Sequence, residues 1–169
     1  MIMQKILIAL VLLLTVSCST GLDTQMQAVL DEVEGNLGYV NTLDVDNMAK
    51  MTRWFLRRGD EAQKARALYC LGRSQFNERS YSAAIVTYTQ ALDLAEKAGD
   101  HLHEGLVCYD MAHTCGATGN TSDELLYLGK AAVAFEAAEL QGKSLQALLE
   151  IGSVNASMGK YDSAEEIFK

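Results

Sequence analysis

Histidine and cysteine are the side chains of this sequence with the most chemical potential, and several of them lie close together. Residues 101–115 contain all three histidines, His101, His103 and His113, and two of the four cysteines, Cys108 and Cys115. Zinc ligands of these types must all lie ~2.0–2.3 Å from one ion. In a helix, however, His113 lies about 140° around the axis from Cys108, because 3.6 residues make one turn. We therefore predict that these side chains bind no metal.

The same residues provide no pair suited to nucleophilic or acid–base catalysis. His101 and His103 are two positions apart, so in a helix they point to different sides. No glycine-rich loop follows a strand pattern, as a phosphate site would require. The sequence therefore predicts no catalytic residues, no cofactor and no enzymatic activity.

A third cysteine, Cys18, lies in a segment typical of protein export. Lys5 precedes the unbroken apolar run Ile6–Leu14, and the small residues Thr15-Val16-Ser17 lead into Cys18. This is the pattern of a secretory signal peptide, and the run is much shorter than the ~20 residues of a membrane span. The segment resembles the bacterial lipobox, which implies that Cys18 is lipidated and becomes the mature N-terminus. Thr15 departs from the large aliphatic residue of that motif, so simple cleavage and an uncleaved anchor stay open.

Lipidation of Cys18 would place the protein in the cell envelope, anchored to a bacterial membrane on its periplasmic or outer-membrane face. The other cysteines, Cys70, Cys108 and Cys115, are odd in number, which excludes a complete set of internal disulfides. Their positions in the helical pattern favour burial as small hydrophobic side chains. Cys18 is therefore the one cysteine to which we assign a function.

The charge of the chain is acidic overall but unevenly distributed. The formal net charge of −8 argues against a nucleic-acid partner, because phosphate binding needs a surface of cations. Residues 50–79 nevertheless contain eight basic and three acidic residues. Such clusters are commonly solvated or ion-paired helix faces, so this basic segment is open to that interpretation as well as to partner binding.

Two helical patterns in residues 65–98 are the clearest sign of how the chain is organised. Counting from Ala65, apolar and small residues recur at helical spacing. They are Leu68, Leu71, Gly72 and Gln75 in the first helix and Tyr81, Ala84, Tyr88 and Ala91 in the second. The segment resembles a tetratricopeptide repeat, which implies an all-α, right-handed solenoid of helical hairpins.

The pattern recurs at a spacing longer than the 34 residues of a standard tetratricopeptide repeat. Three dipeptides occupy the same pattern position forty residues apart, namely Leu71-Gly72, Met111-Ala112 and Ile151-Gly152. The pair Gly59-Asp60, which would end one helix and cap the next, recurs as Gly99-Asp100. We expect about three forty-residue repeats in residues 60–169, with cores starting near residues 65, 105 and 145 and the last repeat truncated.

The preceding residues divide into a signal peptide at 1–17 and a segment at 18–59 that contains the anchor and two further helical patterns. One period before Leu71-Gly72, the chain has Asp31-Glu32, so this helical pair does not have the repeat signature. We interpret it as an atypical N-terminal cap, since the end of a repeat array must cover an exposed apolar face.

In tetratricopeptide arrays the first helix of each repeat lines a concave groove, which implies binding residues between the packing positions. We assign the groove to Arg66, Tyr69, Arg73, Asn77, Tyr109 and His113, with Gln146 and Ser153 further along the chain. This polar and aromatic set suits recognition of a protein or peptide segment. An ordinary solvated helix face is the competing interpretation.

The sequence therefore predicts a lipid-anchored extracytoplasmic scaffold that mediates protein–protein interaction without catalysis. One alternative is the sensor part of a truncated signalling or regulatory membrane protein with the same repeats. Another is a carbohydrate-binding lipoprotein, although a single tryptophan offers few platforms for sugar stacking.

Overall fold

The computed structural model describes Thr24, residues 26–32, Leu37 and residues 44–168. Cys18 lies outside the described residues. The chain divides into two compact units, residues 1–39 and residues 40–169. Within the first unit, residues 26–32 are helical, as the spacing of Met26 and Leu30 predicts.

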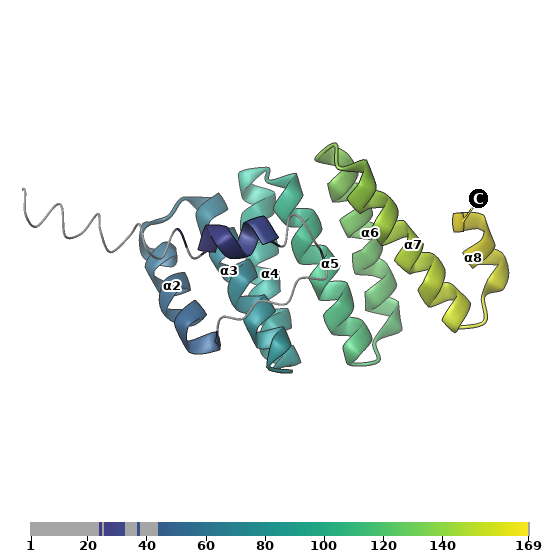
Figure 1. Cartoon of the computed structure of the whole chain (residues 1–169), viewed down its shortest axis with the longest axis horizontal. Coiled ribbons are helices and arrows are strands. Elements are labelled where there is room, and N and C mark those ends of the chain that lie inside the picture. The colour runs from purple at the N-terminus through teal and green to yellow at the C-terminus, as the bar shows by residue number, and fades with distance from the viewer. Residues whose placement is uncertain (1–23, 25, 33–36, 38–43, 169) are drawn as a thin grey trace, which may run out of the picture. The chain divides into compact units, whose positions relative to one another are not determined.

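The second unit is a succession of helices (Figure 1). They are α2 (Val45–Arg58), α3 (Glu61–Asn77), α4 (Tyr81–Ala98), α5 (His101–Ala117), α6 (Thr121–Ala137), α7 (Gln141–Ser157) and α8 (Tyr161–Phe168). No strand occurs in the described part of the chain. Each helix packs on the next, and α3 also contacts α5. The all-α prediction is confirmed, and the packing of successive helices is compatible with a helical repeat array.

The turns between these helices follow a 20-residue rhythm. Five residues with positive φ lie twenty positions apart, namely Arg79, Gly99, Gly119, Glu139 and Gly159. At each turn the amide of the next residue donates a hydrogen bond five residues back, as from Ser80 to Gln75 at 2.8 Å. The left-handed residue itself donates three residues back, as from Arg79 to Phe76 at 2.8 Å. This pair of bonds is the Schellman motif, which ends a helix by satisfying its last carbonyls. One helix and its turn thus take twenty residues, and two take the forty of the sequence pattern.

The predicted helix starts at Asp60 and Asp100 are confirmed. Asp60 accepts a hydrogen bond from the Gln63 amide at 2.8 Å, and the Gln63 side chain accepts one from the Asp60 amide at 3.1 Å. This capping box satisfies two amides that would otherwise have no partner. The Asp100 carboxylate accepts from the amide of His103 in the same way.

Complementary side-chain sizes bring the helices of each hairpin together. A Cβ on Gly72 would lie 2.4 Å from the Tyr88 ring, and one on Gly105 would lie 2.5 Å from the Phe135 ring. Forty residues before Gly105 and Phe135, the same two positions are occupied by Ala65 and Ala95, both fully buried. Two small residues in one hairpin thus correspond to a glycine and a phenylalanine in the next, and in both hairpins a small residue allows the helices to approach closely.

Candidate functional site

The six predicted groove residues lie on α3 and α5, but the structure gives most of them partners within the chain. Tyr69, Arg73 and Tyr109 are buried, Arg66 is half-buried, and Asn77 and His113 are exposed. Their contacts form two clusters that connect α3 with α5 and α5 with α7.

The first cluster centres on an ion pair between α3 and α5. The Arg73 guanidinium donates to the Asp110 carboxylate at 2.7 Å and to the Tyr69 hydroxyl at 3.1 Å. The side chains of Arg73 and Asp110 are only 8% and 13% exposed. Burial lowers the pKa of Arg73, but the Asp110 carboxylate and the Tyr69 oxygen more than offset this and raise it. The arginine is therefore charged at every physiological pH, whereas burial raises the pKa of Asp110 and the charge of Arg73 only partly offsets this.

The second cluster connects α5 with α7 around the Glu150 carboxylate. Glu150 accepts a short hydrogen bond from the Tyr109 hydroxyl and lies 3.2 Å from Nε2 of His113. The Gln146 side chain donates to the Tyr109 hydroxyl at 3.0 Å. The hydrogen bond with Glu150 raises the pKa of His113. Burial raises the pKa of Glu150, and its bonds with His113 and Tyr109 outweigh this effect and lower it.

The two clusters are copies of one arrangement. Tyr69, Arg73 and Asp110 become Tyr109, His113 and Glu150 forty residues further on. Each is a tyrosine, a cationic side chain one helical turn later, and a carboxylate from the next helix but one. Sequence reasoning named the tyrosines and the cations but not the acids. The signal was present in the forty-residue spacing of Asp110 and Glu150.

A further ion pair accounts for Arg66. Its guanidinium lies 3.3 Å from the Asp100 carboxylate, which also lies 2.9 Å from Nδ1 of the buried His103. Burial raises the pKa of Asp100, whereas the hydrogen bond with His103 and the charge of Arg66 lower it to about 2 in sum. Arg66 and Arg73 in the basic segment are thus paired with acids of the next hairpin. The assignment of the six residues to partner binding stays a prediction.

The three cysteines that the structure describes have no features of reactive thiols. Cys70, Cys108 and Cys115 are free and buried, as predicted. Burial raises the pKa of Cys70 and of Cys108 to about 12, so both are protonated at neutral pH and poor nucleophiles. Within the described residues, no group of three potential ligands could hold a metal ion. No helix among those residues is both long and apolar enough to cross a bilayer.

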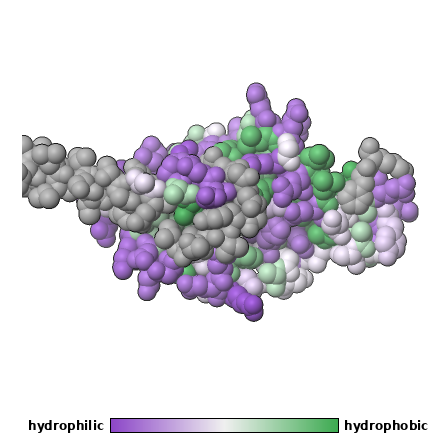
Figure 2. All heavy atoms as spheres, viewed as in Figure 1, coloured by the Kyte–Doolittle hydropathy of each residue, from purple (hydrophilic) through white to green (hydrophobic). Residues whose placement is uncertain are grey.

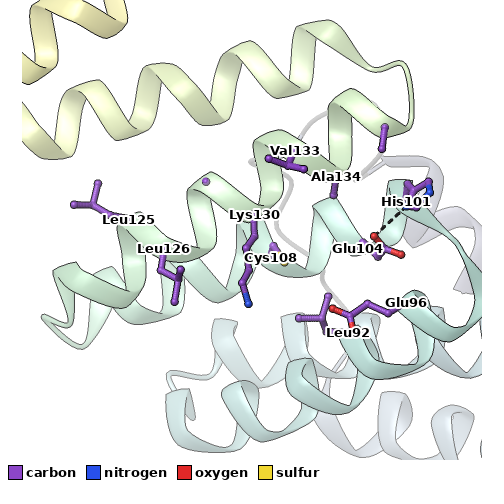
Figure 3. Close-up of a pocket in the computed structure, with 12 residues that line it drawn as sticks. Leu92, Glu96, His101, Glu104, Cys108, Leu125, Leu126, Lys130, Val133 and Ala134 are labelled. Carbon is purple, nitrogen blue, oxygen red and sulfur yellow. Dashed lines mark hydrogen bonds and ion pairs between the residues drawn. The ribbon is translucent and has the colours of Figure 1, made fainter.

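An open apolar groove lies where α4 and α6 both pack on α5 (Figure 3). Its volume is about 680 Å³, within the ~300–1,000 Å³ typical of ligand pockets. It is lined by Leu92 and Glu96 of α4, by His101, Glu104 and Cys108 of α5, and by Leu125, Leu126, Gly129, Lys130, Val133, Ala134 and Ala137 of α6. We call it the α4–α6 groove.

The wall of the α4–α6 groove formed by α6 is accessible. Leu126 is 52% exposed and Val133 is 68% exposed. Nothing lies within 4 Å of a Cβ placed on Gly129, which stands between them on the helix. Large apolar side chains at such exposure lose stabilisation unless something covers them, so this wall is suited to contact with another molecule.

The α4–α6 groove also contains charged side chains. Acids lie on α4 and α5, and one lysine lies on α6. Glu96 is exposed at the end of α4, and Glu104 pairs with His101 at 3.1 Å. Lys130 lies over the ring of Tyr127 at 5.4 Å. Figure 3 shows Glu96, Glu104 and His101 together at one end, with Leu125 and Leu126 at the other.

A second groove lies against α6 and α7 and shares part of its lining pattern with the first. Its volume is about 750 Å³, and it is lined by Glu136, Glu139, Gln141, Ser144, Leu145 and Leu148. Glu136, Gln141, Ser144 and Leu148 stand forty residues after Glu96, His101, Glu104 and Cys108 of the α4–α6 groove. Leu145 is 55% exposed, and Figure 2 shows hydrophobic residues at the surface toward the C-terminal helices. We call it the α6–α7 groove.

Comparisons with known proteins do not identify a family. No model of a protein family matches the chain, and no curated protein matches it.

Proposed function

We propose that this chain is a helical-repeat scaffold that binds a segment of another protein and catalyses no reaction. The α4–α6 groove supports this proposal most directly, because it combines an apolar floor with exposed leucine and valine side chains along α6. Helical arrays commonly use such surfaces, in which a partner covers apolar side chains and charges at the edge set its orientation.

The architecture that we propose is a right-handed solenoid of about three forty-residue repeats similar to tetratricopeptide repeats. The 20-residue rhythm of the turns supports this, as does the recurrence of the polar cluster and of the groove after forty residues. The internal ion pairs of Arg66 and Arg73 make the α4–α6 groove a better candidate for binding than the predicted groove on α3 and α5.

We also propose that the scaffold is anchored to a bacterial membrane through a lipid on Cys18. The apolar run followed by small residues and a cysteine supports this. Substitution Cys18→Ala is expected to move the protein from the membrane fraction to the soluble fraction of the cell envelope. Retention of the variant in the membrane fraction would contradict the anchor and leave the scaffold unaffected.

Two glycines offer a matched test of binding in the groove. Gly129 of α6 lines the α4–α6 groove, whereas Gly142 of α7 does not, and neither has an atom within 4 Å of an added Cβ. Gly129→Leu places a large side chain in the groove, and Gly142→Leu adds the same side chain outside it. Affinity purification of the full chain from crosslinked cells of its host should recover a discrete partner with wild type and Gly142→Leu but not with Gly129→Leu. Equal recovery by all three proteins would refute binding in this groove.

A further inference from the structure

The two grooves share four lining positions that are forty residues apart, and both are bordered by acids. Glu96 of the α4–α6 groove corresponds to Glu136 of the α6–α7 groove, and both side chains are exposed. Glu104 adds a second acid to the first groove, and Glu139 adds a second acid to the other. The lining of the first groove thus has two acids and one lysine, Lys130, and that of the second has two acids and no lysine or arginine, so the excess of carboxylates in both favours a cationic ligand.

The dimensions of the first groove fit a helix. Its lining residues on α6 extend from Leu125 to Ala137, which is about 18 Å along a helix axis. Two of the lining residues on α6, Gly129 and Ala134, are small. Small residues allow the axis of a second helix to approach to the ~8–10 Å of ordinary helix packing. The exposed Leu126 and Val133 are two turns apart, a spacing that apolar residues on a facing helix would match.

From this shape and charge we infer that the grooves bind a basic amphipathic helix of a partner protein. Its apolar face would cover Leu126 and Val133 and place a large side chain over Gly129. Its lysine or arginine residues would lie against Glu96. Where a second basic segment follows this helix in the partner, the cations of that segment would lie against Glu136. This inference rests on the proposed scaffold function and specifies the chemistry of its partner.

Three synthetic 14-residue peptides test the inference on the full chain by fluorescence anisotropy. The first has leucines at helical spacing and arginines on the flanks of that face, the second replaces the arginines with glutamates, and the third replaces the leucines with serines. We expect only the first to bind, and to bind more weakly as salt increases. Glu96→Gln should weaken binding about two- to fivefold, as for other exposed charge pairs. Gly129→Leu should weaken it at least about tenfold, and Gly142→Leu should leave it unchanged.

Equal binding of the glutamate peptide, or binding of none of the three, would overturn the basic-helix inference. In either case, recovery of a cellular partner that depends on Gly129 would keep the scaffold function, so the two failures are distinguishable. Sedimentation of the chain alone tests the remaining alternative, in which the chain forms a dimer through the groove. A dimer that Gly129→Leu dissociates would show that a second copy occupies the groove, and would also overturn the inference.

Discussion

In the wild type, the stability that the contacts between α5 and α7 contribute should depend on pH, and the substitution His113→Arg should remove this dependence. In the first cluster the cation is Arg73, which stays charged, whereas in the second it is His113. Its pKa is raised in the folded protein by Glu150, so the pair stabilises the fold fully below the ordinary histidine pKa of ~6.5. That stabilisation is lost as the pH rises through the raised value, because the imidazole then becomes neutral.

The magnitude follows from the exposure of the pair. The His113 side chain is 43% exposed and that of Glu150 is 30% exposed, so solvent screens their attraction. Exposed ion pairs contribute ~0.2–1 kcal/mol to the free energy of unfolding. Because Glu150 also accepts a hydrogen bond from Tyr109, we expect this pair to contribute near the upper limit. For a chain of this size, 1 kcal/mol corresponds to ~2–4 °C in Tm. We therefore expect wild type to lose about 2 °C more than His113→Arg when the pH rises from 5.5 to 8.5.

Thermal unfolding of both proteins at the two pH values measures this difference. Other groups near His113 are Asp110 on α5 and Glu124 on α6, and both proteins retain them. His101 and His103 are likewise common to both proteins. An identical pH dependence of the two proteins, or a greater loss by His113→Arg, would refute the role of His113 in this connection.

Four further variants test the packing of the array by urea unfolding. Arg73→Ala should cost ~3–5 kcal/mol because it leaves the Asp110 carboxylate buried without its cation, and Arg73→Met with Asp110→Leu should restore most of the loss. Glu139→Gly should stabilise the chain by about 1 kcal/mol, because Glu139 has a φ of 60°, and a destabilisation would contradict the strain. Gly72→Ala should cost ~1–3 kcal/mol because its Cβ meets the Tyr88 ring, and no change in stability would show that the ring moves freely.

The sequence predicts the helices of this protein better than it predicts their polar contacts. Glycine and aspartate at residues 59–60 and 99–100 are local signals, and both positions end one helix and cap the next. Arg79 and Glu139 take the same left-handed turns without glycine, and only the forty-residue spacing of the pattern would have revealed them. The forty-residue spacing and the capping residues thus predict where the helices end, even at turns that have no glycine.

The α4–α6 groove could not be predicted from the sequence, because it depends on how α4 and α6 are placed around α5. Leu126 and Val133 belong to the helical pattern of α6, and periodicity alone does not distinguish an exposed apolar residue from a buried one. Arg73 presents the opposite case, since its charge suggests exposure but Asp110 allows its burial. Both outcomes depend on neighbours at least one helix away along the chain.

Site-specific photocrosslinking tests the central claim, binding of a protein segment in the α4–α6 groove, most directly. A photoreactive amino acid at Val133 faces the groove, and one at Val86 provides an exposed valine control on α4 outside it. In cells of the host, we predict a discrete crosslinked protein from position 133, none from position 86, and loss of the product when Gly129→Leu is added. The same product from both positions, or none from position 133, would contradict it.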